Sequence, residues 1–186
     1  MKNNIRISGG LLKGKKIPFD FKETLRPTSN KLKEIIFNWL QFEIQDCICL
    51  DLFAGTGSLG IEALSRESPK VTFIELNKRN YSVLSKNIQS LGVKDKSKVF
   101  FKDAFDWVKK QDLSEFDLIF LDPPFGKEFE LKILKLLLRK DEMKPSCKIY
   151  LEYSKFTEIE IPDTYKIIKE KSVGDVKALL LQKNEN

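Results

Sequence analysis

Residues 47–66 read CICLDLFAGTGSLGIEALSR, and this stretch decides which fold the chain can adopt. Its first seven residues form an apolar run, which is typical of a buried strand. The glycines that follow have the pattern G-x-G-x-x-G and open a helix that runs to Arg66. Because glycine has no side chain, the backbone at this motif can approach a ligand closely. The stretch therefore predicts the first strand and helix of an open α/β sheet, with a ligand-binding loop between them.

The same alternation of strand and helix continues toward the C-terminus. Further strands are predicted at 71–76, 98–104, 116–122 and 147–153. Helices are predicted at 77–92, around Trp107 and at 127–140. Short connections between such elements imply parallel strands joined by right-handed crossovers. The last two apolar stretches, 164–173 and 175–183, predict a closing hairpin that adds one antiparallel strand to the sheet.

The chain begins with a segment of a different character. Residues 1–25 alternate apolar and polar residues around glycines, which predicts a short β-hairpin. In residues 26–40, RPTSNKLKEIIFNWL, apolar residues recur at helical spacing behind a Thr-Ser cap, which predicts an amphipathic helix. We therefore expect one α/β domain at 26–186, preceded by an N-terminal extension at 1–25.

The composition limits the classes of protein that fit this chain. It has 186 residues, 41% of them hydrophobic and 32% charged, and no apolar stretch approaches the roughly 20 residues that span a bilayer. The N-terminus has no apolar signal segment, so we expect a cytoplasmic protein without a membrane partner. The three cysteines suit buried, reduced thiols, and in the absence of any histidine we expect no metal site.

The formal net charge is +6, and several basic residues gather near the N-terminus. Lys13, Lys15 and Lys16 lie close together there, and Arg6 and Arg26 flank them. Each phosphate group that such residues neutralise releases counterions and adds affinity. The distribution of charge therefore favours a polyanionic partner such as nucleic acid.

Acidic residues lie at the ends of four predicted strands, namely Asp51, Glu75, Asp103 and Asp122. Parallel strands present their carboxyl ends at one edge of a sheet, so these residues describe one crevice. The glycine motif alone also fits a dinucleotide site. Asp51 favours S-adenosylmethionine instead, because a carboxylate repels a pyrophosphate but tolerates an ammonium and a sulfonium. Glu75 would then accept hydrogen bonds from the ribose hydroxyls, and Asp103 would face the adenine amino group. The alternative is that Asp51, Glu75 and Asp103 only cap loops or helices.

Residues 118–126, LIFLDPPFG, end a buried strand with a carboxylate, two prolines and an aromatic ring. Proline has no amide donor and fixes its own φ, so the strand stops at Asp122. The Asp122 carboxylate and the Pro123 carbonyl can accept hydrogen bonds from an exocyclic amine of a nucleobase, and Phe125 can stack on that base. Such acceptors stabilise the positive charge that develops on the nitrogen during methylation. The released proton can pass to Asp122 or to water, so no histidine is needed.

The motif Asp-Pro-Pro-Phe resembles the [DN]-P-P-[FYW] motif of amino-group methyltransferases. A longer series of segments is similar to the bacterial 16S rRNA guanine-N2 methyltransferases of RsmD type, in the same order and from about residue 5 to about residue 182. The segments are RISGG at 6–10, RPTS at 26–29, EIIFNWL at 34–40, LDLFAGTGSLGIEALSR at 50–66, LDPPF at 121–125 and YLE at 150–152. Departures are mild, since the tail before RISGG is short and lysine replaces arginine at several basic positions.

The resemblance implies a Rossmann-like S-adenosylmethionine-dependent methyltransferase fold, with a mostly parallel seven-stranded sheet, an antiparallel C-terminal strand and an N-terminal hairpin. It implies methyl transfer to N2 of guanine 966 in 16S rRNA within the 30S subunit, and we expect the protein to be a monomer. It places the cofactor on Asp51, Phe53, Gly55, Gly57, Glu75, Asp103 and Ala104. It places the reacting base on Asp122, Pro123 and Phe125. It places the RNA on Arg6, Lys13, Lys15, Lys16, Arg26, Pro27 and Thr28.

Two other functions stay open on the sequence. An adenine-N6 methyltransferase acting on RNA or DNA fits the same motif, because Asp-Pro-Pro-Phe suits either amine. A non-catalytic RNA assembly factor that keeps the cofactor also fits, although an intact Asp122 beside an intact glycine loop favours turnover. A dehydrogenase fits least well, because it leaves the double proline unexplained.

Overall fold

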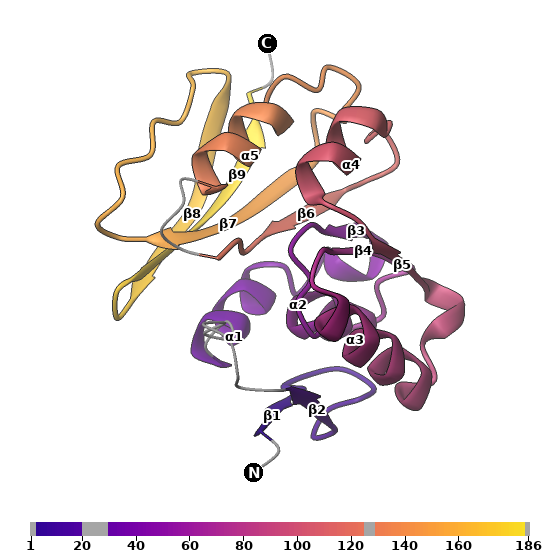
Figure 1. Cartoon of the computed structure of the whole chain (residues 1–186). Helices are drawn as coiled ribbons and strands as arrows, with labels where there is room; N and C mark the ends of the chain where they lie inside the picture. Colours follow the sequence, from indigo (N-terminus) through magenta and orange to yellow (C-terminus); the bar gives the residue numbers. More distant parts are fainter. Residues whose placement is uncertain (1–2, 20–29, 125–128, 185–186) are drawn as a thin grey trace.

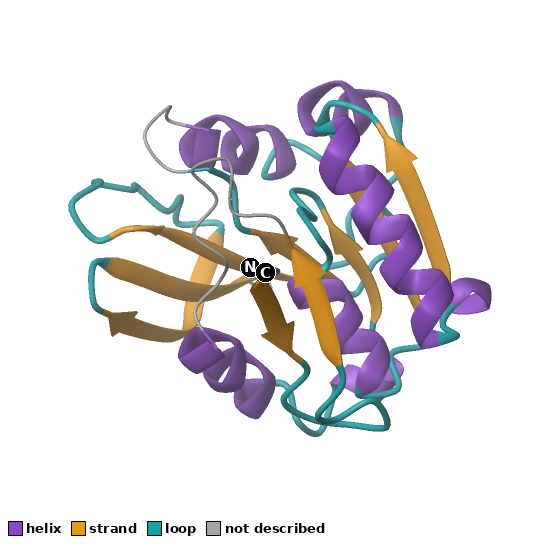
Figure 2. Cartoon of the chain, turned by 60° about the horizontal axis from the view of Figure 1, so that its bottom comes forward, coloured by secondary structure: helices purple, strands orange, loops and turns teal. Residues whose placement is uncertain are grey.

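The computed structural model describes residues 3–19, 30–124 and 129–184 of the chain. These residues form a central sheet, helices on its two faces and a small N-terminal hairpin (Figure 1). A second view shows the strands running between the two groups of helices (Figure 2). The architecture is therefore α/β, with a sheet layer between two helical layers.

The central sheet has seven strands in the order β5-β4-β3-β6-β7-β9-β8. Their bounds are Ile48–Asp51 for β3, Lys70–Glu75 for β4, Ser97–Phe101 for β5, Leu118–Leu121 for β6, Lys148–Ser154 for β7, Tyr165–Val173 for β8 and Val176–Lys183 for β9. Strands β3 to β7 pair in parallel, whereas β9 runs antiparallel to both β7 and β8. The strand order switches direction at β3, and ligands bind at such switch points in open α/β sheets.

The helices divide the core into two parts. Their bounds are Asn30–Trp39 for α1, Ser58–Ser65 for α2, Lys78–Leu91 for α3, Ala104–Lys110 for α4 and Phe129–Leu137 for α5, with short 3₁₀ helices at Ile44–Asp46 and Lys94–Lys96. Helices α1, α2 and α3 pack on one face with Phe120 and Tyr150, and α4 and α5 pack on the other with Ile119 and Ile149. Side chains alternate along a strand, so odd and even positions meet different helices.

A separate two-stranded hairpin precedes α1, formed by β1 (Asn3–Arg6) and β2 (Lys16–Phe19). The loop between its strands lies against the end of α2. There the Ser65 hydroxyl donates a hydrogen bond to the Gly9 carbonyl at 2.5 Å. Gly10 has a φ of +74°, and a Cβ at this position would lie 1.8 Å from the Ser65 carbonyl oxygen. Only glycine therefore fits this close approach.

A buried ion pair fixes the hairpin loop to α1 and α2. Lys33 and Glu62 have fully buried side chains, and their Nζ and Oε2 atoms lie 3.3 Å apart. Lys33 also donates a hydrogen bond to the Arg6 carbonyl at 2.6 Å. Glu62 accepts hydrogen bonds of 2.8–2.9 Å from the amide and hydroxyl of Ser8 and from the amide of Gly9. Charge-assisted hydrogen bonds thus hold the hairpin in addition to apolar packing.

The predicted fold is confirmed, including the mostly parallel seven-stranded sheet, the antiparallel strand near the C-terminus and the N-terminal hairpin. The three cysteines are free, buried thiols, as expected. The predicted boundary between extension and domain falls among residues 20–29, outside the described residues, and stays a prediction. Within the described part of the chain, none of the helices has the length and apolar character required to span a bilayer.

Candidate active site

Four carboxyl groups follow one another along the edge where the parallel strands end. Glu75 ends β4, Asp51 ends β3, Asp122 follows β6 and Glu152 lies near the end of β7. These strands are neighbours in the sheet. The alternation of side chains directs all four toward the face that α1, α2 and α3 cover. Among the described residues, no group of three or more cysteine, aspartate or glutamate side chains is arranged to hold a metal ion.

The turn between β3 and α2 has backbone conformations that favour glycine. Gly55 has a φ of +55°, and Gly57, which precedes α2, has a φ of +93°. A Cβ at Gly60 would lie 2.2 Å from the Phe73 ring, so glycine here lets α2 pack closely on β4. The Asp51 carboxylate accepts a hydrogen bond from the Gly60 amide at 3.1 Å. The turn of residues 52–57 therefore brings half-buried and buried backbone to the edge of the sheet, and we call it the glycine cradle.

Asp51 lies beneath the glycine cradle and is 2% exposed. Burial raises the pKa of this carboxyl group to about 7, and the charges of Asp122 and Glu75 contribute to the increase. The hydrogen bond from the Gly60 amide acts in the opposite direction and lowers the pKa. Asp51 therefore titrates near neutral pH, and a cation bound beside it would favour the ionised form.

Glu75 links the two loops beside the cradle. Its carboxylate accepts hydrogen bonds from the amides of Gly55 and Asn77, both at 2.6 Å. Burial raises its pKa, and these hydrogen bonds oppose that increase. Leu76, directly after it, is 61% exposed, and Phe101 at the end of β5 is 47% exposed. These two exposed apolar side chains are absent from the predicted site, although both lie close in sequence to its acidic residues.

The remaining predicted cofactor residues lie along the same edge. Asp103 caps α4, where its carboxylate accepts a hydrogen bond from the Asp106 amide at 3.0 Å, and the neighbouring Ala104 is buried. Phe53 packs edge-on against Phe105 with ring centroids 6.3 Å apart.

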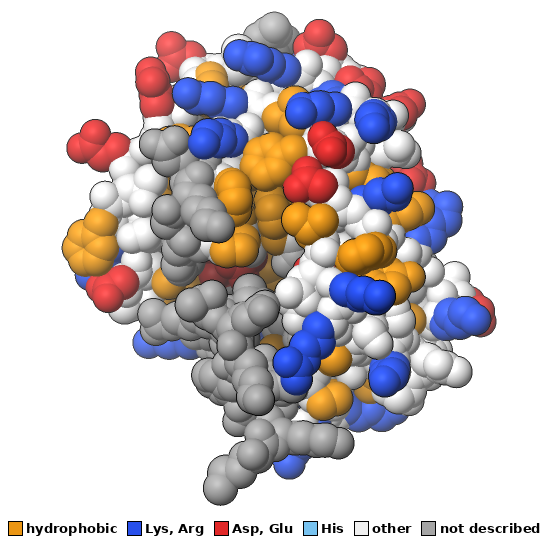
Figure 3. All heavy atoms as spheres, in the orientation of Figure 1, with side chains coloured by type: hydrophobic (Ala, Val, Ile, Leu, Met, Phe, Trp, Pro, Cys, Tyr) orange, Lys and Arg blue, Asp and Glu red, His pale blue; other side chains and the backbone are white. Residues whose placement is uncertain are grey.

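Hydrophobic side chains gather in the middle of the face drawn in Figure 3, where the surface is hollowed, and lysine and arginine side chains lie around them.

The end of β6 agrees with the expectation that two prolines stop this strand. Asp122 is half-buried after the last residue of β6, and Pro123 is buried. The charge of Asp122 raises the pKa of Asp51 on one neighbouring strand and of Glu152 on the other. The three carboxyl groups therefore share one electrostatic environment. Phe125, the predicted stacking residue, lies outside the described residues.

Glu152 belongs to this group, although the sequence analysis predicts no role for it beyond its place in a matched segment. It is 2% exposed, and the Tyr150 hydroxyl donates a hydrogen bond to its Oε1 at 2.6 Å. Burial raises its pKa well above the usual range, and the charge of Asp122 adds to this effect. The sequence YLE sits in an apolar strand, and only the sheet order places its carboxyl group beside Asp122.

The basic residues predicted to contact nucleic acid lie on the hairpin and its loop. Those within the described part of the chain are Arg6, Lys13, Lys15 and Lys16, and all are exposed. Arg6 lies directly opposite Lys16 in the pairing of β1 with β2. Like charges in this position destabilise a hairpin, so the pair favours an anion at this surface. Arg26, Pro27 and Thr28 lie outside the described residues.

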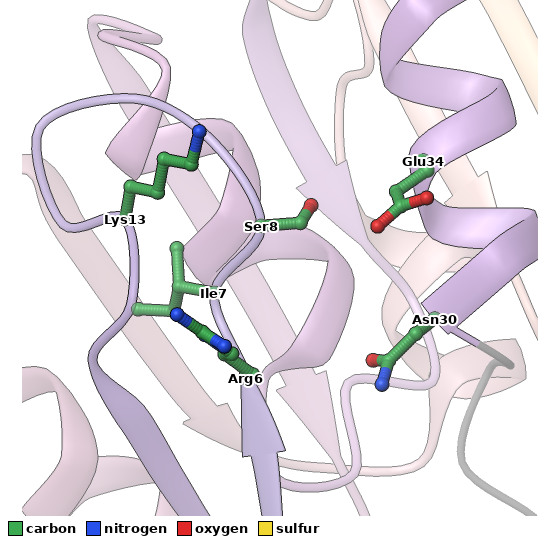
Figure 4. Close-up of a pocket in the computed structure, with 6 residues that line it drawn as sticks. All are labelled: Arg6, Ile7, Ser8, Lys13, Asn30 and Glu34. Atoms are coloured by element: carbon green, nitrogen blue, oxygen red, sulfur yellow. The ribbon is translucent and has the colours of Figure 1, made fainter.

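A pocket of about 360 Å³ lies between the hairpin loop and the start of α1 (Figure 4). Its lining residues are Arg6, Ile7, Ser8, Lys13, Asn30 and Glu34. In Figure 4, Arg6 and Lys13 come from the hairpin side, and Asn30 and Glu34 extend from α1 on the other side. The pocket therefore combines two cations with polar groups that can donate and accept hydrogen bonds.

Comparisons with known proteins identify the family. The family model described as Conserved hypothetical protein 95 matches residues 5–182. The Haemophilus influenzae protein named ribosomal RNA small subunit methyltransferase D is 41% identical over 183 residues, which cover 97% of this chain and 95% of that protein. The Escherichia coli protein of the same name is 33% identical over 184 residues, which cover 96% of this chain and 90% of that protein.

Solved structures extend the comparison to the fold. The Escherichia coli putative methyltransferase yhhF has a TM-score of 0.87 at 31% identity, covering 97% of this chain and 98% of its own. A Salinibacter ruber RNA methyltransferase in complex with S-adenosyl-L-homocysteine has a TM-score of 0.65 at 16% identity, covering 86% of this chain and 95% of its own. The predicted methyltransferase fold and RsmD-type resemblance are confirmed. The chain is similar to proteins named ribosomal RNA small subunit methyltransferase D across nearly their whole length, and it belongs to the family described as Conserved hypothetical protein 95.

Proposed function

We propose that this protein transfers a methyl group from S-adenosylmethionine to the exocyclic N2 of a guanine in 16S rRNA, at guanine 966 by the resemblance given above. The observation that carries the proposal is the position of Asp122 and Pro123 directly after β6, the strand next to β3 and its glycine cradle. An acceptor for an aromatic amine thus lies beside a loop suited to a nucleoside cofactor. The names of the similar proteins support rRNA as the substrate class.

The residues around the glycine cradle fit S-adenosylmethionine. In this proposal the cofactor contacts Asp51, Phe53, Gly55, Gly57, Glu75, Asp103 and Ala104. The carboxyl group of Asp51 suits an ammonium and a sulfonium, whereas it would repel a pyrophosphate. Leu76 and Phe101 offer exposed apolar surface for the adenine ring, beside the Glu75 carboxylate that would accept ribose hydroxyls. The bound cofactor supplies a methyl group made electrophilic by the sulfonium.

Asp122 and Pro123 make the amine reactive by holding it in position. The N2 amine of guanine is a poor nucleophile, because its lone pair is delocalised into the ring. The Asp122 carboxylate and the Pro123 carbonyl would accept its two N–H hydrogens and direct the lone pair toward the methyl carbon. As the N–C bond forms and the S–C bond breaks, the nitrogen gains positive charge that Asp122 stabilises. The nitrogen then loses one proton to Asp122 or to water.

Binding of S-adenosylmethionine should release a proton near neutral pH. Asp51 holds a proton in part of the population because burial raises its pKa to about 7. A bound sulfonium and ammonium favour the ionised carboxylate, so binding lowers this pKa. The affinity should therefore fall as the pH decreases from about 8 to about 6, because the proton must leave before the cation binds. Calorimetric titration in two buffers of different ionisation enthalpy measures both effects.

Two controls separate this effect from general pH dependence. Asp51→Asn should bind the cofactor more weakly, and its affinity should change little with pH because the titrating group is absent. S-adenosylhomocysteine has no sulfonium, so it should release less of a proton from the unmodified protein. Equal proton release by the unmodified protein and Asp51→Asn would show that another group titrates.

The hairpin would hold the RNA beside this site, with Arg6 and Lys16 as an exposed like-charged pair and the pocket of Figure 4 next to them. Phosphate contacts position a nucleic acid without reading its sequence. The proposed substrate is a looped guanine on the assembled or nearly assembled 30S subunit, because a base inside a helix must first be exposed at a cost of a few kcal/mol. We also propose that the protein acts as a monomer in the cytoplasm.

Replacing Lys13, Lys15 and Lys16 together by alanine should weaken RNA binding and reduce its dependence on salt. Each lost phosphate contact reduces the magnitude of the slope of log K against log salt by about 0.7–0.9, so the loss of three contacts should reduce it by about 2–3. Fluorescence anisotropy with an rRNA fragment at several salt concentrations measures this slope.

The matched control replaces Lys109, Lys110 and Lys135 by alanine. These lysines are exposed on α4 and α5, which cover the opposite face of the sheet. The control removes the same charge and should leave the slope unchanged. If the hairpin variant also keeps the original slope, the hairpin does not face the RNA.

A methylation assay tests the substrate class directly. Radiolabelled methyl groups are offered to 30S subunits that lack the modification, to naked 16S rRNA and to DNA, and the labelled nucleoside is identified. We expect label in the 30S subunit, recovered as N2-methylguanosine from one position. Recovery of N6-methyladenine would favour the adenine methyltransferase, and cofactor binding without label in any substrate would favour the assembly factor.

A further inference from the structure

The carboxyl group of Glu152 lies beside Asp122 and has no role in the mechanism above. Strands β6 and β7 pair in parallel with Leu121 opposite Leu151, so Asp122 and Glu152 are the next residues along this register. Neighbouring strands lie about 4.8 Å apart, and residues in register direct their side chains to the same face. The two carboxyl groups are therefore neighbours on the face that carries the glycine cradle.

The two carboxyl groups differ in their exposure to water. Glu152 is 2% exposed, whereas Asp122 is half-buried. On its other side, β9 places Ala178 opposite Glu152. The Tyr150 hydroxyl donates to Glu152 at 2.6 Å, and the Tyr150 ring packs edge-on against Phe120, with ring centroids 6.2 Å apart. In the described part of the chain, Glu152 is thus buried beside Asp122 and the Tyr150 hydroxyl donates a hydrogen bond to it.

We infer that Glu152 is the neutral, proton-carrying member of a carboxyl pair with Asp122, and that it keeps Asp122 charged and in position to accept the amine of the target base. Two adjacent carboxyl groups in a poorly hydrated site do not both ionise at neutral pH, so one of them holds a proton. Burial disfavours the charged form, which assigns the proton to Glu152 and leaves the charge on Asp122. This inference rests on the proposed function for the role of Asp122.

The electrostatics of the surrounding groups agree with this assignment. Burial raises the pKa of Glu152, and the charge of Asp122 raises it further, whereas the Tyr150 hydroxyl lowers it. Tyr150 and Asp122 are the described groups that face Glu152 from β7 and β6, and Asp51 lies beyond Asp122 on β3. A proton on Asp122 instead would convert one of its acceptors into a donor and loosen its hold on the amine. The proton that the amine releases can then rest on Asp122 before it passes to water.

Glu152→Gln tests the protonation state without any substrate. Glutamine has the shape of the protonated acid and can still accept the hydrogen bond from Tyr150. A carboxyl group with a raised pKa in the folded state binds a proton that the unfolded chain releases, so stability falls as the pH rises above the unfolded pKa of about 4.5. Glu152→Gln should remove this loss. Its melting temperature should exceed that of the unmodified protein at pH 7, and the difference should grow toward higher pH.

Glu115→Gln changes an exposed carboxylate that pairs with Lys70, and it should shift the melting temperature little at any pH. A melting temperature of Glu152→Gln several degrees below that of the unmodified protein at pH 7 would show that Glu152 is ionised and paired with a cation. That result would overturn the inference and leave the proposed methylation intact.

Kinetics on 30S subunits test the positioning role. Glu152→Ala should lower kcat about tenfold or more with little change in KM, because Asp122 loses the neighbour that holds it in place. Glu152→Gln should recover most of this loss, since it supplies the neutral hydrogen-bonding group. If glutamine is as damaging as alanine and KM rises, Glu152 contacts the base as a carboxylate and the inference fails. If the unmodified protein labels no guanine, the proposed function fails, while the stability measurement still decides the state of Glu152.

Discussion

Asp122→Ala should slow methyl transfer by about 10²–10³-fold, which is the usual effect of removing one preorganised group that stabilises charge in a transition state. The affinity for S-adenosylmethionine should stay within about threefold, because the glycine cradle and Glu75 keep their own hydrogen bonds. Single-turnover transfer to 30S subunits measures the rate, and calorimetric titration measures the cofactor affinity. The separation of the two effects is what identifies Asp122 as a group that acts on the amine.

Two further variants sharpen this test. Asp122→Asn keeps one carbonyl acceptor but not the charge, so its rate should fall between those of Asp122→Ala and the unmodified protein. Asp106→Ala removes an exposed aspartate on α4, with a side chain that is 68% exposed, and should leave the rate unchanged. An equal loss of turnover and of cofactor affinity in Asp122→Ala would mean that Asp122 supports the structure of the site instead.

Lys33→Ala should destabilise the fold by about 3–5 kcal/mol, the range found when one partner of a buried ion pair is removed. Both Lys33 and Glu62 are fully buried, so the substitution leaves an empty space where the lysine stem lay. The Glu62 carboxylate then keeps only Arg66, with Nε 3.1 Å from Oε1, as a cationic partner among the described residues. The Arg6 carbonyl also loses its 2.6 Å hydrogen bond. For a chain of this length we expect the melting temperature to fall by about 6–20 °C.

The matched control is Lys70→Ala, which removes an exposed pair with Glu115 at 2.7 Å. Pairs of this kind contribute about 0–1 kcal/mol, so the variant should melt close to the unmodified protein. The double variant Lys33→Met with Glu62→Gln removes both charges and should be more stable than Lys33→Ala. Equal effects of Lys33→Ala and Lys70→Ala would show that the buried pair is not what holds the hairpin to α1 and α2.

The sheet and the glycine cradle could be predicted from the sequence because their signals are local. Residues 47–66 contain a complete strand, a glycine turn and a helix, and the two prolines after Asp122 mark the end of β6. The row of acidic residues at the strand ends could also be predicted, because parallel strands end at the same edge of a sheet. Glu75 and Asp103 also bind the amides of Gly55 and Asp106, which is the capping alternative that the sequence left open for these residues.

The features that the sequence could not supply depend on contacts between distant elements. From the sequence alone, Lys33 fits the solvated face of an amphipathic helix. In the structure it is buried, because its ammonium group forms an ion pair with Glu62 of α2. Glu152 reads as one polar residue in an apolar strand, and its position beside Asp122 depends on β7 pairing with β6. The roles predicted for Phe125 and for residues 26–28 stay predictions.

Helix α2 begins at the glycine cradle and ends where Glu62 and Ser65 hold the hairpin loop. Its eight residues span about 12 Å at a rise of 1.5 Å per residue. In an enzyme of the proposed kind, α2 would set a fixed distance between the methyl donor and the lysines proposed to contact the RNA phosphates. The protein would then select its target by measuring reach from the gripped phosphates, so a base one nucleotide away would miss the methyl group even with the same chemical identity.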